Sequence, residues 1–299
     1  MYYGDFGGAL YNTTNGDSIN PVFPPDGFAI RSVLATKCGI LMIKKNVHFS
    51  GDEGRNFNPI DTLVHRDLPW QSLMLDVPSH GRIYLCIRTI NGSITGLAFS
   101  EDCGRTFVKD TAFDAPIFGN TRFHSLAQLK NGKLFGWNVE DHKLYRRDSK
   151  NEKFFEVVTT GLPPAPFFIS RFNNTLVATD TSGAQGALFS NDEGLNWSPY
   201  AGLPASGLNS TVGAFDQVLL TGTDSFGVYR LTAGNTFQPS NNGLALNTRV
   251  YAIAAKENIY KNDVSIRVIF LATDKGLYRS FDAGQNWTLA IPGSFRAVN

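Results

Sequence analysis

One stretch decides the fold, Phe189-Ser-Asn-Asp-Glu-Gly-Leu-Asn-Trp197, because the chain repeats it. Three other segments match it almost residue for residue: Phe49-Ser-Gly-Asp-Glu-Gly-Arg-Asn-Phe57, Phe99-Ser-Glu-Asp-Cys-Gly-Arg-Thr-Phe107 and Arg279-Ser-Phe-Asp-Ala-Gly-Gln-Asn-Trp287. The shared pattern is Ser-x-Asp-x-Gly-x-Asn/Thr-Trp/Phe. Such self-similarity indicates a repeat architecture, in which each copy belongs to one structural unit.

The pattern has the chemistry of a tight turn between two strands. Glycine takes the positive φ that such a turn needs. The aspartate can accept hydrogen bonds from backbone N–H groups of the turn, and the Trp or Phe begins the next strand and buries a large apolar surface. Catalysis or calcium binding is the alternative role for the aspartates. We favour turn capping, because equivalent sites spread around a rim cannot all form one active centre.

Structural roles are therefore predicted for the following residues: Ser50, Asp52, Gly54, Phe57, Asp102, Gly104, Phe107, Asp192, Gly194, Trp197, Asp282, Gly284 and Trp287. Degenerate copies occupy residues 12–19, 146–154 and 230–237. In the second of these, Asp148 is interpreted as the surviving aspartate of a turn one residue longer. The steps between Gly16, Gly54, Gly104, Lys150, Gly194, Gly234 and Gly284 are 38 to 50 residues. This spacing fits four-stranded propeller blades.

The pattern resembles the Asp box, or BNR repeat, of sialidases, xyloglucanases, sortilin-type receptors, photosystem II assembly factors and many phage proteins. Through its repeats the resemblance covers the whole chain, and it implies a fold more than an activity. We expect an all-β protein, a single seven-bladed β-propeller of four-stranded antiparallel blades. The photosystem II assembly factors and the phage Asp-box propellers are the families it resembles most.

The chain ends predict how the ring closes. Residues 1–23 have room for only three strands, whereas residues 294–299 have the apolar spacing of an innermost strand. We expect a single domain over 1–299, with blade 1 formed by 294–299 plus 1–23 and blades 2–7 spanning about 24–293. Closure of this kind removes exposed sheet edges.

Composition excludes several function classes. The formal net charge is +1 and no basic stripe occurs, which argues against a nucleic-acid partner. Three cysteines without CxxC spacing predict neither a disulfide framework nor a zinc site. We expect no metal and no cofactor. The chain shows no signal peptide of the usual kind and no apolar run long enough to span a bilayer, so no membrane insertion is expected.

Candidate binding residues come from the loops that join strand D of one blade to strand A of the next, and strand B to strand C. These connections gather on one face of a propeller, opposite the C–D turns. The ligand- or partner-binding candidates are Arg66, Asp67, Trp70, Phe118, Arg122 and Trp137. No catalytic residue is assigned. The arginine motif of sialidases is missing, although Asp67 and Asp141 could form a glycosidase acid/base pair.

These observations favour a non-enzymatic binding or scaffolding propeller, a phage virion or tail-associated protein. Its partners would be other virion or tail proteins, or a host-surface glycan, and its location the virion. The alternatives are a carbohydrate-active hydrolase, sialidase-like or another glycosidase, and an intracellular assembly factor of the cytoplasm.

Overall fold

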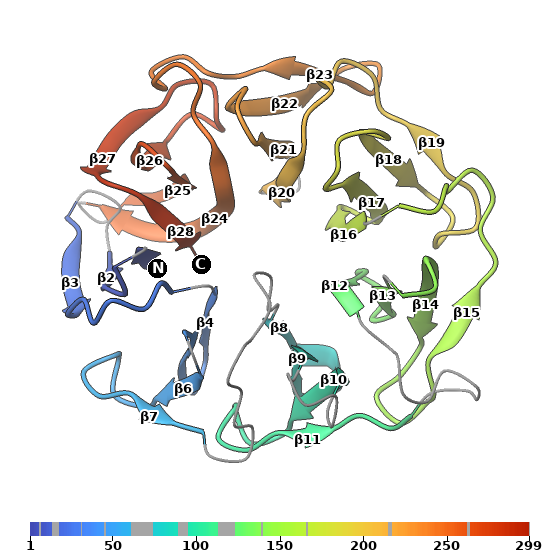
Figure 1. The fold of residues 1–299 in the computed structure, drawn as a ribbon, viewed down its shortest axis with the longest axis horizontal. Helices are drawn as coiled ribbons and strands as arrows, with labels where there is room; N and C mark the ends of the chain where they lie inside the picture. Colours follow the sequence, from blue (N-terminus) through green and yellow to red (C-terminus); the bar gives the residue numbers. More distant parts are fainter. Residues whose placement is uncertain are drawn as a thin grey trace.

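The computed structural model forms a ring of seven blades that follow one another in chain order (Figure 1). Each blade is a four-stranded antiparallel sheet, with strands lettered A to D from the centre outward. The structure describes residues 1–5, 7–13, 18–30, 32–44, 46–60, 74–88, 95–112, 123–138, 140–165, 167–214, 217–261 and 264–298. Its only helix within these ranges is one short 3-10 turn, η1 (Pro78–His80). The predicted all-β, seven-bladed propeller is confirmed.

The strands run in the order A, B, C, D within each blade. Blade 1 has β28 (Phe295–Val298), β1 (Tyr2–Asp5), β2 (Leu10–Asn12) and β3 (Asn20–Phe23); blade 2 has β4 (Ser32–Thr36), β5 (Gly39–Ile43), β6 (Val47–Ser50) and β7 (Asn58–Pro59). Blade 3 has β8 (Met74–Val77), β9 (Arg82–Arg88), β10 (Thr95–Ser100) and β11 (Val108–Lys109); blade 4 has β12 (Phe123–Gln128), β13 (Leu134–Asn138), β14 (Lys143–Arg147) and β15 (Phe155–Val157). Blade 5 has β16 (Phe167–Phe172), β17 (Thr175–Asp180), β18 (Ala187–Ser190) and β19 (Ser198–Pro199). Blade 6 has β20 (Leu208–Ala214), β21 (Val218–Thr223), β22 (Val228–Thr232) and β23 (Thr236–Pro239); blade 7 has β24 (Val250–Lys261), β25 (Val264–Thr273), β26 (Gly276–Ser280) and β27 (Thr288–Pro292).

The two chain ends close the ring as expected. Strand β28, which follows blade 7 in the chain, pairs antiparallel with β1 in the register Gly4↔Ala297. It supplies the inner strand that the first residues of the chain lack, and Figure 1 shows the two termini side by side near the centre. The Phe295 side chain is buried, with its ring centroid 5.8 Å from that of Tyr11. Phe295 also packs with Val268 and Phe270 of blade 7 in one buried cluster, so the strand that completes blade 1 is in contact with blade 7.

The core lies between neighbouring blades rather than inside one layer. Because each sheet is covered on both faces, its middle strands bury successive residues, as Leu176 and Val177 do on β17. The cluster between blades 4 and 5 joins Trp137, Phe167 and Trp197 with Leu176. Burial on both faces explains why the sequence of these strands consists of short apolar runs between glycines and polar turns.

The C–D turns that carry the repeated pattern are held by their own serine and aspartate. In blade 5, the Gly194 N–H donates to Ser190 Oγ at 2.9 Å, and the serine hydroxyl donates to Asp192 Oδ1 at 2.7 Å. Asn196 donates to both Asp192 oxygens, from its backbone at 2.9 Å and its side-chain amide at 2.7 Å. Equivalent bonds bind Asp52, Asp102 and Asp282. In all four turns the aspartate thus accepts hydrogen bonds from its own turn.

The aromatic residue that ends each turn starts the outer strand and packs inward. Trp197, Trp287 and Phe107 are buried, whereas Phe57 is half-buried against the cluster between blades 1 and 2. The four glycines of the turns, at positions 54, 104, 194 and 284, all have positive φ. Each of these four turns therefore combines a glycine at positive φ with an aromatic side chain that packs inward.

The degenerate turn of blade 4 has a different register from the one predicted. Arg146 faces Phe155 across β14 and β15, just as Phe49 faces Asn58 in blade 2, so the two turns have equal length. Arg147 therefore occupies the position of the repeated serine, and Asp148 does not occupy the position of the repeated aspartate. The prediction of a longer turn with a surviving aspartate is wrong, because the strand ladder fixes the register where the motif itself has decayed.

The outer strands are also tied to one another around the rim. After strand D of blade 4, Thr160 donates its N–H to Leu195 O and accepts from the Trp197 N–H in blade 5, at 2.8 and 2.9 Å. Gly161 follows with φ 78°, and a Cβ there would lie 2.6 Å from Trp197 O. Only glycine lets the linker approach the next blade this closely.

Candidate functional site

The predicted binding residues fall largely outside the part of the chain that the structure describes. These are Arg66, Asp67, Trp70, Phe118 and Arg122. Trp137 is described, and the expectation that it belongs to a surface loop is wrong. It lies on β13 with 1% of its surface exposed, and its indole N–H donates to Ala165 O at 3.0 Å. Trp137 is a core residue between blades 4 and 5, because the strand extends one residue beyond it.

One described part of the D–A/B–C loop face lies at the junction of blades 6 and 7. Arg249, just before β24, places Nη2 2.7 Å from Asp224 Oδ1 in the B–C loop of blade 6. Its backbone N–H donates to Asp274 Oδ1 at 2.8 Å in the B–C loop of blade 7. The Gly227 N–H donates to Thr248 O at 3.0 Å. These bonds fasten three loops from two blades into one unit.

Two large apolar side chains project from this unit into solvent. Phe226 is 51% exposed and Leu246 is 89% exposed, although each lies within two residues of the bond between Gly227 and Thr248. We call Asp224, Phe226, Leu246, Arg249 and Asp274 the blade 6–7 loop cluster. An exposed apolar pair on braced loops is a surface suited to contact with another molecule.

Two described acidic side chains of this face, Asp141 and Asp180, hold the conformation of their own loops. Asp141 accepts from the Lys143 N–H at 3.2 Å and from the Tyr145 hydroxyl at 2.7 Å. Burial, and secondly this carboxylate, raise the pKa of Tyr145 above its ordinary value. Asp180 is fully buried and accepts from both Ser182 and the Gln185 N–H. Neither carboxylate is arranged as a free acid or base. The predicted partner of Asp141, Asp67, lies outside the described residues.

A buried lysine connects blades 1 and 2 on the same face. Lys44 is 3% exposed, and its Nζ donates to Gly8 O at 2.6 Å and to Asp26 Oδ1 at 3.0 Å. It also lies 4.4 Å from the centroid of the Phe23 ring. Burial opposes ionisation of Asp26, but the bonds from Lys44 and from the Phe28 N–H outweigh it and lower the pKa of Asp26. Sequence reasoning missed this pair, because Lys44 there is only part of a short basic run.

On the opposite face, the residue between the aspartate and the glycine of the repeated turn, the fifth of the nine-residue segment, contacts the preceding blade. Glu193 Oε2 lies 2.7 Å from Lys133 Nζ in blade 4, and Ala283 O accepts from Arg230 Nε in blade 6 at 3.2 Å. At the same position, Cys103 forms a disulfide with Cys38 of blade 2, with a Cα–Cα distance of 5.8 Å. The expectation that the cysteines form no disulfide is wrong. Cysteines 65 residues apart meet because the A–B hairpin of one blade lies beside the C–D turn of the next.

No cluster of three or more His, Cys, Asp or Glu side chains among the described residues has the geometry to hold a metal ion. Within the same residues, no helix combines the length and apolar character that crossing a membrane requires. Cys86 is the remaining cysteine; it is buried, and burial raises the pKa of its thiol to about 12.

No family model matches the chain, and no curated protein matches it. Solved structures do. YCF48 bound to a D1 peptide is similar at 13% identity and a TM-score of 0.63, over 94% of this chain and 88% of that one. Virginiamycin B lyase from Staphylococcus aureus, in an inactive form with quinupristin, has 14% identity and a TM-score of 0.61, over 86% and 82%.

Two larger proteins share the same fold. An ancestral GH74 enzyme has 16% identity and a TM-score of 0.63, and the extracellular domain of a putative hybrid two-component system from B. thetaiotaomicron has 13% and 0.62. Each match covers 87% of this chain, but the chain spans only 38% and 33% of those proteins. At these identities the likeness establishes a propeller fold, which different functions share.

Proposed function

We propose that this chain is a non-enzymatic binding propeller that holds an apolar peptide segment of a partner protein on its D–A/B–C loop face. The observation that carries the proposal is the exposure of Phe226 and Leu246 on loops braced by Asp224, Arg249 and Asp274. Aromatic and aliphatic anchors beside an arginine are typical of the centre of a protein interface. Braced loops reduce the entropy lost on binding.

Two further observations support binding over catalysis. Asp141 and Asp180 are engaged by donors of their own loops, so they are poorly placed for acid/base chemistry. YCF48, a propeller of similar fold and similar length, has been solved with a peptide bound. The finer prediction of a virion or tail partner, or a host-surface glycan, gains no support from the structural likenesses.

A peptide-display selection on the purified protein tests the proposal. Selected peptides should carry apolar residues, and the double variant Phe226→Ala/Leu246→Ala should weaken their binding about tenfold or more. The matched control is Leu195→Ala/Phe281→Ala, which removes two exposed apolar side chains from C–D turns on the other face. Equal loss in both variants, or none in the first, would refute the choice of surface.

The hydrolase alternative needs its own assay. Reducing-end measurements on sialosides, xyloglucan and bacterial surface polysaccharides should show no turnover. Turnover that Asp141→Asn or Asp67→Asn abolishes would overturn the binding proposal, because it would establish an acid/base pair on this face.

A further inference from the structure

Two arginines occupy the same place in different blades. Arg146 on β14 faces Phe155, and Arg230 on β22 faces Gln238; in each case the facing residue follows the aromatic that starts strand D. The residue that meets each arginine from the next blade is also equivalent, being the fifth of a repeated turn. It is Glu193 beside Arg146 and Ala283 beside Arg230.

Between blades 4 and 5, the guanidinium is neutralised by the protein itself. Arg146 Nη1 lies 3.0 Å from Glu193 Oε2, and Arg146 Nε lies 2.7 Å from Asp148 Oδ1. Glu193 is also bound by Lys133 and Asn131 of blade 4. This junction thus supplies its own carboxylates.

Between blades 6 and 7, the carboxylate is missing. Alanine at position 283 offers only its backbone oxygen, which accepts from Arg230 Nε at 3.2 Å. Among the described residues, no hydrogen bond or ion pair engages Nη1 or Nη2 of Arg230. Yet this side chain is half-buried, so its charge is less well hydrated than that of an open surface arginine. Nη1 and Nη2 of Arg230 therefore remain available, and Nη1 is the atom that binds the Glu193 carboxylate from Arg146 at the blade 4–5 junction.

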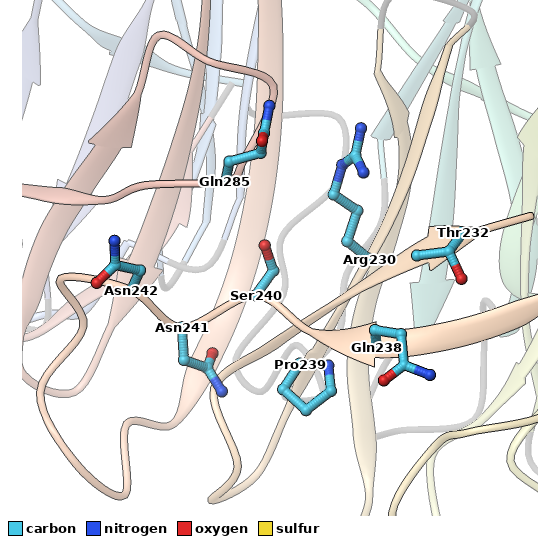
Figure 2. A pocket seen from close by; sticks show the side chains of 8 residues that line it. All are labelled: Arg230, Thr232, Gln238, Pro239, Ser240, Asn241, Asn242 and Gln285. Carbon is cyan, nitrogen blue, oxygen red and sulfur yellow. The ribbon is translucent and has the colours of Figure 1, made fainter.

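Arg230 lines an open groove on the rim, and Figure 2 shows the side chains around it. Its volume is about 280 Å³. Its lining includes Arg230, Gln238, Pro239, Ser240, Asn242 and Gln285. The Ser240 hydroxyl donates to Gly284 O, and the Asn242 side-chain amide donates to Asn286 Oδ1. These bonds hold the Ser240 and Asn242 side chains in place at the edge of the groove. The side-chain amide of the exposed Gln238 makes no hydrogen bond to another described residue.

We propose that this rim groove binds the carboxylate of an acidic sugar residue, of the uronic acid class. A guanidinium presents paired N–H donors that match a carboxylate in two-point geometry. The side-chain amide of Gln238 can both donate and accept, as sugar hydroxyls require. The Gln285 amide donates one N–H to Asp282 O at 3.1 Å, and its oxygen and second N–H remain for a sugar hydroxyl. No aromatic or large aliphatic side chain lines the groove among the described residues. That composition disfavours a peptide, whose interface core is normally apolar.

The internal repeat provides a sharp test. Ala283→Glu should rebuild the blade 4–5 ion pair at the blade 6–7 junction and so occupy Arg230. Glutamate fits the backbone there, since Glu193 and Ala283 have φ of 60° and 61°. Arg230→Gln should remove the charge without removing the side chain, and Arg146→Gln is the matched control in the filled junction. Circular dichroism and melting temperatures confirm that each variant is folded.

Isothermal titration with galacturonic acid oligomers should show binding to the parent protein and to Arg146→Gln. Both Arg230→Gln and Ala283→Glu should weaken it about tenfold or more, since a hydrogen bond to a charged group is lost. Added salt should weaken it too, and neutral glucose oligomers should not bind.

Three results would overturn the proposal. One is the absence of binding by any carboxylated sugar. Another is binding that Arg230→Gln and Ala283→Glu leave unchanged, which would place it elsewhere on the molecule. The third is binding of oligoglutamate or inorganic phosphate, in preference to the sugar and with the same sensitivity to both variants. That result would identify the groove as an anion or acidic-peptide site. Phe226→Ala/Leu246→Ala should not affect sugar binding, so the two proposed sites can fail separately.

Discussion

Arg147 and Asp110 form a two-point ion pair that is shut off from solvent between blades 3 and 4. Nη1 lies 2.6 Å from Asp110 Oδ2 and Nη2 lies 2.9 Å from Oδ1, while the side chains are 0% and 2% exposed. Nη1 also donates to the Tyr84 hydroxyl at 3.2 Å, and the guanidinium lies 4.3 Å from the centroid of the Phe154 ring. The pair lies where blades 2, 3, 5 and 7 have a serine-capped turn, so an interblade charge pair replaces a local cap.

Replacing one member of this pair should lower the free energy of unfolding far more than replacing both members together. Arg147→Met leaves a buried, unpaired carboxylate, and we expect a loss of about 3–5 kcal/mol in the free energy of unfolding. Asp110→Leu should cost a similar amount. The double variant should be much less destabilised than the sum of the two, because no uncompensated charge remains. Urea unfolding of the four proteins gives the coupling energy. Strictly additive losses would mean that the two charges do not interact in the folded state.

A second prediction concerns the turns that retain the pattern. Ser190→Ala should cost about 1–3 kcal/mol, because it leaves the buried Gly194 N–H without its acceptor. Trp197→Ala should cost about 3–5 kcal/mol through loss of packing between blades 4 and 5. Neither should change the affinity for a peptide selected on the loop face. Thermal melts and titrations of the same samples check both parts; lost binding at an unchanged melting temperature would give these turns a functional role.

The repeated turn allowed the blades to be counted because it combines a glycine at positive φ, a capping serine and aspartate, and a buried aromatic. Each of these constrains the residue type at one position. Closure followed from the apolar residues of 294–299, which lack a partner unless they complete blade 1. These are local signals, and a single sequence contains them in full.

Other features depend on which turns and hairpins become neighbours, which local signals do not reveal. Arg147 became recognisable as the counterpart of the repeated serine only through the ladder register of β14 and β15. Cys38 and Cys103 pair across two blades. Cys103 and Glu193 occupy the same turn position, and Glu193 reaches the preceding blade. That equivalence is the signal that could have predicted the disulfide. The binding candidates remain predictions for residues 61–73 and 113–122, outside the described part.

Ring closure gives a third prediction. Phe295→Ala should lower the free energy of unfolding by about 3–5 kcal/mol, since this buried ring packs in the cluster between blades 7 and 1. Deleting residues 294–299 should be more damaging, because β1 would also lose its strand partner. Arg296→Ala, on the same strand but half-buried, is the control and should have a much smaller effect. A deletion variant that melts cooperatively within a few degrees of the parent would refute the closure.

The Cys38–Cys103 bond should stabilise the contact between blades 2 and 3. Replacing both cysteines with serine should cost about 2–4 kcal/mol, as expected for closing a loop of 65 residues. Reducing agent should destabilise the parent protein and leave the double variant unchanged. Alkylation of the denatured chain should label one thiol before reduction, that of Cys86, and three afterwards. Three labelled thiols without reductant would show that the bond does not form.

The last prediction is a pH dependence that comes from His80. This side chain is 4% exposed, and its Nδ1 lies 3.1 Å from the Tyr84 hydroxyl, which in turn accepts from Arg147. Burial lowers the pKa of His80, and the positive charges of Arg147, Arg82 and Lys150 lower it further, against a weaker opposing backbone contact at Gly132. The folded protein therefore binds the His80 proton more weakly than the unfolded chain, whose histidine pKa is about 6.5.

Stability from this group is fully present above about pH 6.5 and should be lost as the pH falls from there toward the lowered folded pKa, because the unfolded state takes up the proton first. Urea unfolding of the parent at about pH 7, 6 and 5 should show this decline. In His80→Gln the decline should be shallower, since glutamine can still accept a hydrogen bond from Tyr84 but does not titrate. His142→Gln, an exposed histidine, should behave as the parent. Equal slopes for the parent and His80→Gln would show that His80 does not couple protonation to folding.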